Sequence, residues 1–118
     1  MNIQVTRIYT GPDNQSHFED MPIPLEENLV TKRRSKLMKA TGILFQETVS
    51  NYESDWHNAP RRQFVITIGG EGEVEIGDGS KRRFKAGDIV LNEDTTGQGH
   101  ISRSVNGQSW QAVWVPLD

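Results

Sequence analysis

The sequence has no cysteine among its 118 residues. This absence excludes disulfide bonds, thiolate zinc sites, iron–sulfur clusters and a cysteine nucleophile. Long apolar runs are missing as well, because no stretch could span a bilayer and residues 1–8 lack the apolar segment of a signal peptide. We therefore expect a cytoplasmic protein that has no membrane partner.

An excess of positive charge is also absent, since the formal net charge is −3. Basic clusters occur at residues 32–34, 61–62 and 81–83, but each has acidic residues nearby in the sequence. Solvated strand or loop edges account for such clusters, and no nucleic-acid partner is expected. The glycine-rich stretches lack the lysine and following helix of a phosphate loop, and no Gly-x-Ser-x-Gly elbow is present.

Helical periodicity is scarce, whereas short strands separated by turn residues recur along the chain. Residues 26–39 are the one stretch that could be helical, but they lack a clear apolar stripe and are expected to form a loop or a short helical turn. The two prolines of residues 21–25 suit an extended edge segment. The pattern predicts one all-β domain over residues 1–118, a sandwich or barrel. Strands are expected at residues 3–9, 42–49, 63–68, 73–77, 81–85, 89–92, 100–105 and 110–115.

Residues 63–68 alternate between a larger apolar face and a smaller, more polar one. Gln63, Val65 and Thr67 form the smaller face, which is typical of a barrel wall that leaves room for a ligand. The other face of this strand needs cover from another sheet or subunit. A homodimer would supply that cover, although a closed sandwich could bury both faces without a partner.

Residues 56–100 resemble the two paired motifs of the cupin superfamily. The first motif has two histidines one residue apart, a short gap, a glutamate, six residues and a glycine. Here Gln63 is followed by six residues and Gly70, while His57 lies close to the place of the second histidine and Asp55 at the place of the first.

The second cupin motif runs from a glycine through five residues to a proline, and then to a glycine and a histidine. Gly87 begins it here, Glu93 takes the place of the proline, and His100 follows a slightly longer loop. The resemblance covers residues 42–115. Within the superfamily, the chain resembles most specifically a group of single-domain bacterial cupins of uncharacterised function. It implies a jelly-roll barrel, the double-stranded β-helix, preceded by an N-terminal strand and arm over residues 1–41.

The resemblance also implies a metal site, because a typical cupin holds iron, manganese, nickel or zinc with three histidines and a glutamate. The corresponding residues here are His57, His100 and Gln63, with Asp55 as a fourth candidate ligand. A neutral glutamine amide is a poor substitute for a carboxylate, so any divalent metal should be held weakly or not at all. The alternative is a metal-free polar cluster in which the two histidines bind each other, water or a ligand.

We therefore expect a small-molecule-binding cupin of unknown ligand, with no certain cofactor. One alternative is an enzyme. It would be a metal-dependent oxygenase or isomerase using His57 and His100 as ligands, or a metal-free isomerase or epimerase using one of them as a general base. The other alternative is a structural protein with a filled barrel. The small side chains of Val65 and Thr67 favour a real cavity. The candidate pocket residues are His57, Gln63, His100, Trp56, Arg62, Phe45 and Thr67.

Arg62, Trp56 and His17 each allow two interpretations. Arg62 or Arg61 could pair with Glu47, or Arg62 could clamp a substrate carboxylate, because its planar fork suits two oxygens. Trp56 is expected at the barrel rim, where it would close the core or stack on a ligand. His17 is either an exposed loop residue or part of a segment folded over the barrel mouth.

Overall fold

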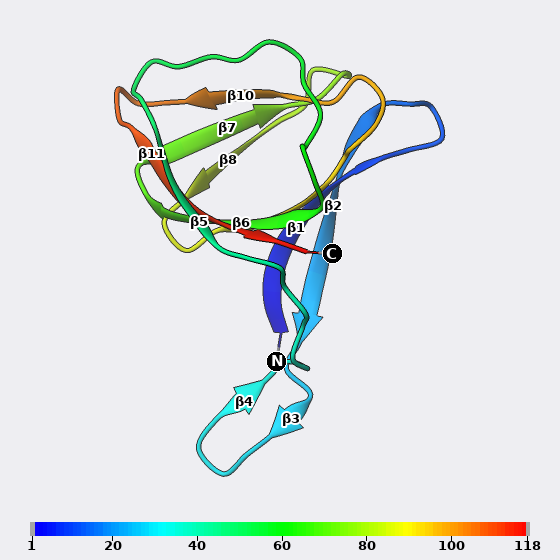
Figure 1. Cartoon of the computed structure of the whole chain (residues 1–118), viewed down its shortest axis with the longest axis vertical. Coiled ribbons are helices and arrows are strands. Elements are labelled where there is room, and N and C mark those ends of the chain that lie inside the picture. Colours follow the sequence, from blue (N-terminus) through cyan, green and yellow to red (C-terminus); the bar gives the residue numbers. More distant parts are fainter. Residues whose placement is uncertain (1, 118) are drawn as a thin grey trace.

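The computed structural model describes residues 2–117, which form strands, turns and loops and no helix (Figure 1). No helix able to cross a membrane is therefore present in this part of the chain. The strands are β1 (Asn2–Thr10), β2 (Ser16–Pro24), β3 (Glu27–Asn28), β4 (Arg33–Arg34), β5 (Leu44–Thr48), β6 (Gln63–Gly69), β7 (Glu71–Glu75), β8 (Lys81–Lys85), β9 (Ile89–Glu93), β10 (Ile101–Ser104) and β11 (Trp110–Pro116).

Two sheets enclose the core of the barrel. The larger has six strands in the order β2-β1-β9-β6-β11-β5, and the smaller has three in the order β10-β7-β8. β1 pairs in parallel with β9, so the N-terminal strand is part of the large sheet. The core between the sheets consists of Ile8, Val65, Val90, Trp110 and Ala112 from the large sheet and Val74 and Phe84 from the small one.

Turn chemistry sets the hairpins where the sequence indicates them. Gly79 has a φ of 86° in the turn between β7 and β8, and its N–H donates to the carbonyl of Ile76 at 3.0 Å. Asn106 and Gly107 both have positive φ, at 59° and 66°, and connect β10 to β11. Asparagine and glycine tolerate this left-handed backbone better than other residues. The proline-containing strand β2 lies at the edge of its sheet, as expected.

The expectation of a loop or a short helical turn at residues 26–39 needs correction. The segment forms a small hairpin, in which β3 and β4 pair through Glu27 opposite Arg34 and Asn28 opposite Arg33. Without an apolar stripe the segment has no face to bury as a helix, whereas oppositely charged side chains can face each other across two strands. Residues 25–42, which we call the arm, project away from the barrel (Figure 1).

Arg62 pairs with Glu93 of β9 and not with Glu47, so the expected Arg62–Glu47 pair is wrong. Glu47 instead accepts a hydrogen bond from Gln111 Nε2 at 2.9 Å. Arg7 of β1 donates to the other Glu93 oxygen at 2.5 Å. Glu93 thereby ties β1 and the segment before β6 to the central strand β9.

Burial alone would raise the pKa of Glu93, but the hydrogen bonds and charges of Arg62 and Arg7 outweigh it and hold this pKa below its ordinary value of 4.5. A carboxylate with a lowered folded-state pKa stabilises the fold above its unfolded-state pKa and loses that effect as the pH falls through the folded value. We therefore expect Glu93→Gln to lower the free energy of unfolding by about 1–2 kcal/mol at pH 7. Urea unfolding at pH 7 and pH 3 measures this, and the difference between parent and variant should shrink at the lower pH. An equal difference at both pH values would contradict the ion-pair account.

Candidate functional site

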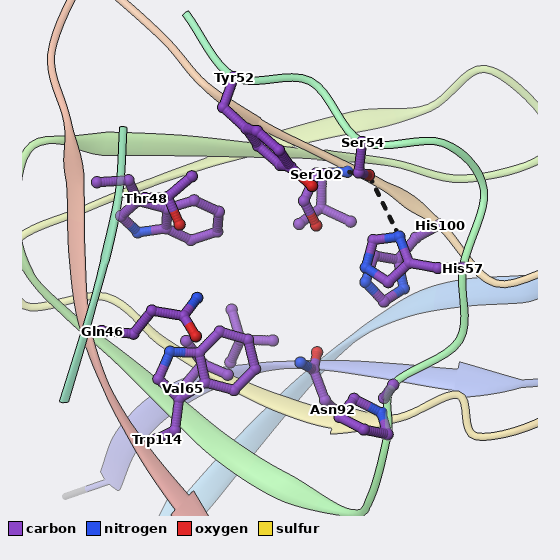
Figure 2. Close-up of a pocket in the computed structure, with 15 residues that line it drawn as sticks. Gln46, Thr48, Tyr52, Ser54, His57, Val65, Asn92, His100, Ser102 and Trp114 are labelled. Atoms are coloured by element: carbon purple, nitrogen blue, oxygen red, sulfur yellow. Dashed lines mark hydrogen bonds between the residues drawn. The ribbon is translucent and has the colours of Figure 1, made fainter. Parts of the chain in front are cut away.

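A cavity of about 140 Å³ lies between the two sheets. Most of its wall is apolar, and polar side chains from several segments also line it (Figure 2). The lining residues are Gln46, Thr48, Tyr52, Ser54, His57, Ala59, Pro60, Val65, Val74, Val90, Asn92, His100, Ser102, Trp110 and Trp114.

His100 is the more buried of the two histidines, and a contact with the Asp94 carboxylate holds its ring in place. Its Nδ1 lies 2.5 Å from Asp94 Oδ2, and the same oxygen accepts the hydroxyl of Ser16 at 2.7 Å. All three side chains are buried. Because an ionised carboxylate only accepts hydrogen bonds, the proton of the neutral ring lies on Nδ1 and Nε2 keeps its lone pair.

His57 lies at the exposed end of the same pair. Its Nδ1 is 2.9 Å from the carbonyl oxygen of Asp55 and 3.2 Å from Ser54 Oγ, the contact drawn in Figure 2. The carbonyl must accept, so in the neutral ring Nδ1 again carries the proton and Nε2 has a free lone pair. The ring centroids of His57 and His100 are 4.6 Å apart. Two imidazoles thus offer hydrogen-bond acceptors at one end of the cavity.

The main chain brings the two histidines together. The N–H of each donates to the carbonyl of the other, at 3.0 Å from His57 and 2.9 Å from His100. The neighbouring Gly99 has a φ of 78°, and a Cβ built there would lie 2.0 Å from the carbonyl oxygen of His57. The approach of the two segments therefore requires a glycine at this position.

The rest of the wall comes from β5, β6, β7, β9, β10 and β11 and from the loop between β5 and β6. Trp110 donates its indole N–H to Thr67 Oγ1 at 3.0 Å, which fixes its ring in the wall, and a Cβ on Gly72 would collide with that ring at 2.2 Å. Gln46 and Thr48 of β5 lie across the cavity from the histidines (Figure 2). No lysine, arginine, aspartate or glutamate is found among the lining residues within 2–117.

Of the residues expected to form the pocket, the structure brings His57 and His100 together, and the other candidates lie outside the lining. Gln63 is fully buried, with Oε1 at 3.5 Å from Arg61 Nη1 and no hydrogen-bond partner for Nε2. Thr67 lies behind Trp110. Phe45 is 69% exposed on the face of β5 opposite Gln46 and Thr48, Trp56 is partly exposed, and Arg62 pairs with Glu93. His17 is the second residue of β2, close to the turn after β1, and its Nε2 contacts Asp13.

Sequence reasoning assigned no role to Asp94, Ser16 or Asn92. Asp94 directly follows β9 and lies six residues before His100, but a carboxylate in a polar loop carries no signal that it will be buried. Gln46 and Thr48 could have been found, because strand alternation alone places them on the face opposite Phe45.

Comparison with solved structures identifies the architecture. A Cupin 2 conserved barrel domain protein from Salinispora arenicola superposes with a TM-score of 0.52 at 22% identity, covering 64% of this chain and 61% of that one. The chain has the cupin fold. A second solved structure, of a protein from Neisseria meningitidis, superposes with a TM-score of 0.51 at 17% identity over 64% of this chain and 72% of its own. No family model matches the sequence, and no curated protein matches it significantly.

The residues of this chain do not fit the metal ion that a typical member of the cupin superfamily holds. His57 and His100 offer two nitrogen ligands, but no carboxylate lines the cavity and Gln63 lies outside its lining. Asp55 contributes only its main-chain carbonyl, which is already bound to His57. Within residues 2–117 no group of three or more histidine, aspartate and glutamate side chains is placed to hold a metal.

We expect Gly99→Ala to disrupt the contact between His57 and His100. The matched control is Gly79→Ala, because Gly79 also has a positive φ, of 86°, but a Cβ there meets nothing within 4 Å. The control should cost about 1 kcal/mol of stability from backbone strain alone. Gly99→Ala should cost at least about 2 kcal/mol more, since the added methyl group meets main-chain atoms. Urea unfolding of both variants checks this, and equal destabilisation would count against the close approach.

Proposed function

We propose that this cupin binds a small neutral molecule in the cavity between its sheets, hydrogen-bonded to His57 and His100, without a firmly held metal ion. The observation that supports this most is the pair of fixed imidazoles at the end of a largely apolar cavity. Both Nδ1 atoms are engaged with the protein, so both Nε2 atoms are available to a ligand that donates hydrogen bonds. A cytoplasmic location, expected from the sequence, belongs to this proposal.

The size and charge of the cavity restrict the ligand. A volume of about 140 Å³ is close to that of an engineered protein cavity that holds benzene. A charged ligand would lose its hydration without an opposite charge on the wall to replace it, at a cost of several kcal/mol. The aromatic faces of Trp110 and Trp114 favour a flat ligand. A small ring with a hydroxyl or N–H group directed at the histidines meets these conditions.

A metal-free isomerase or epimerase is the second candidate, and the buried contact between Asp94 and His100 favours it. A carboxylate behind an imidazole holds the ring in one orientation and stabilises its protonated form, which is how a histidine serves as a general base. In such an enzyme His100 Nε2 would remove a proton from the bound molecule. The ligand-binding function remains the first choice because it needs only the groups that line the cavity.

Phenol and benzoate test the proposed ligand class, because the two rings are similar in size and differ in charge. In titrations followed by two-dimensional NMR, we expect phenol to shift the indole N–H signals of Trp110 and Trp114 with a Kd of about a few millimolar. Benzoate should bind at least about tenfold more weakly, since no cation lines the cavity.

The variant His100→Ala should weaken phenol binding about tenfold, the loss expected for one hydrogen bond. His17→Ala is the matched control, because His17 lies outside the cavity lining and should leave phenol binding unchanged. Equal binding of phenol and benzoate, or equal effects of the two histidine variants, would overturn the proposed ligand class.

Elemental analysis separates the proposal from the metal-dependent alternative. After incubation with iron, manganese, nickel or zinc and gel filtration, the protein should retain less than about one ion per ten chains, because two imidazoles alone hold such ions weakly. The variants His57→Ala and His100→Ala should retain no less than the parent. Near-stoichiometric metal in the parent, lost in both variants, would overturn the metal-free site.

A further inference from the structure

One buried donor in the wall of the cavity has no hydrogen-bond partner. Within residues 2–117, three buried side-chain atoms lack one, namely Gln63 Nε2, Asp94 Oδ1 and Trp114 Nε1. Gln63 and Asp94 lie outside the cavity lining, whereas Trp114 belongs to it. A buried N–H without an acceptor costs free energy that a hydrogen bond would recover. The wall around Trp114 therefore needs an acceptor.

Gln46 is the residue placed to supply that acceptor. It lies on β5 opposite Ala112 of β11, two residues before Trp114, and both Gln46 and Trp114 line the cavity. Such diagonal neighbours on one face of a sheet are within reach when their side chains are long. Figure 2 shows the Gln46 amide beside the indole nitrogen of Trp114. The Gln46 side chain is exposed and forms no hydrogen bond with the other lining residues, so it can turn onto the indole.

The chemistry of these two side chains decides which group then faces the cavity. An indole N–H only donates, so it must be met by the carbonyl oxygen of the amide, Gln46 Oε1. The Nε2 group of Gln46 is then left for the cavity, and this group only donates. The histidine end has the opposite character, because the Nε2 atoms of the neutral His57 and His100 rings only accept.

We propose that the molecule bound in this cavity has a hydrogen-bond donor at one end and an acceptor, such as a carbonyl oxygen, at the opposite end. Its donor faces His57 and His100. Its acceptor takes a hydrogen bond from Gln46 Nε2, while Gln46 Oε1 takes the N–H of Trp114. This inference rests on the proposed function and adds to it the polarity of the ligand.

A ring with a donor alone fits this cavity less well. It would lie against Gln46 without offering an acceptor, so the amide would lose contact with water and gain nothing in return. A site built to hydrogen-bond one group of its ligand discriminates against analogues that lack this group. Flat, neutral rings with an N–H or hydroxyl group opposite a carbonyl oxygen form the expected ligand class.

The compounds 4-pyridone and phenol test the acceptor end. Both are flat, neutral rings of the same size with one donor, but only 4-pyridone has a carbonyl oxygen opposite this donor. In titrations followed by two-dimensional NMR, Gln46→Leu should raise the Kd of 4-pyridone about tenfold, the loss expected for one hydrogen bond. The Kd of phenol should not change, because phenol offers no acceptor to Gln46.

The matched control is Gln111→Leu, which makes the same substitution in the neighbouring strand. Gln111 is also exposed, but it lies outside the cavity lining and its Nε2 donates to Glu47 at 2.9 Å. This variant should leave the Kd of both compounds unchanged. Circular dichroism verifies that both variants are folded, as expected for substitutions of exposed side chains.

The NMR spectrum of the parent protein gives a measurement that needs no variant. The indole N–H signal of Trp114 should move further downfield with 4-pyridone than with phenol, since only 4-pyridone leads the N–H to gain an acceptor. Trp110 is the internal reference, because its N–H already donates to Thr67 Oγ1 at 3.0 Å. The Trp110 signal should move alike with both compounds.

The proposed function and this inference fail in different ways. Phenol that does not bind, or that binds equally to His100→Ala, would overturn both of them. Phenol that binds as expected, together with 4-pyridone that does not bind or whose Kd is the same in Gln46→Leu, would overturn only the acceptor end. Equal losses in Gln46→Leu and Gln111→Leu, or equal shifts of the Trp114 signal with the two compounds, would also overturn it.

Discussion

The buried carboxylate of Asp94 is the contact on which the candidate site depends most. Its side chain joins His100 to Ser16 at the start of β2, and its main-chain carbonyl accepts the N–H of Ala59 at 3.1 Å. Three distant segments therefore meet at one residue. A buried carboxylate is costly unless its oxygens are paired, and here one oxygen has two donors while Oδ1 has none among the described residues. That arrangement exchanges some stability for a fixed orientation of His100.

The sequence allowed the strands and the barrel to be predicted because alternation and turn residues are local signals. The alternation of residues 63–68 shows which face of that strand turns inward, and Asp78-Gly79 and Asn106-Gly107 mark two of the hairpin turns. The resemblance to cupins added the jelly-roll architecture, which no local pattern contains. The hairpin of the arm was missed, because two strands of two residues each leave no periodicity to recognise.

Of the cavity lining, only the two histidines were predicted from the sequence. His57 and His100 are rare residues at recognisable spacings, so the sequence could bring them together. The remaining wall depends on which side chains face inward after the barrel closes, and Gln46 and Tyr52 are ordinary polar residues until then. Gln63 illustrates the converse, because its position in the motif suggested a ligand whereas its side chain is buried beside Arg61. The spacing of a motif predicts where a residue lies on the backbone better than it predicts which way the side chain points.

The arm also has a consequence for how the chain unfolds. A two-stranded hairpin without a buried side chain is marginally stable by itself, and little joins this one to the barrel beyond contacts at its base. The arm should therefore open as a separate cooperative unit while the two sheets stay intact, so its amide hydrogens would exchange with solvent far sooner than those of β6 or β9. Within a single chain, how well the arm is ordered depends almost entirely on the surface that the arm contacts.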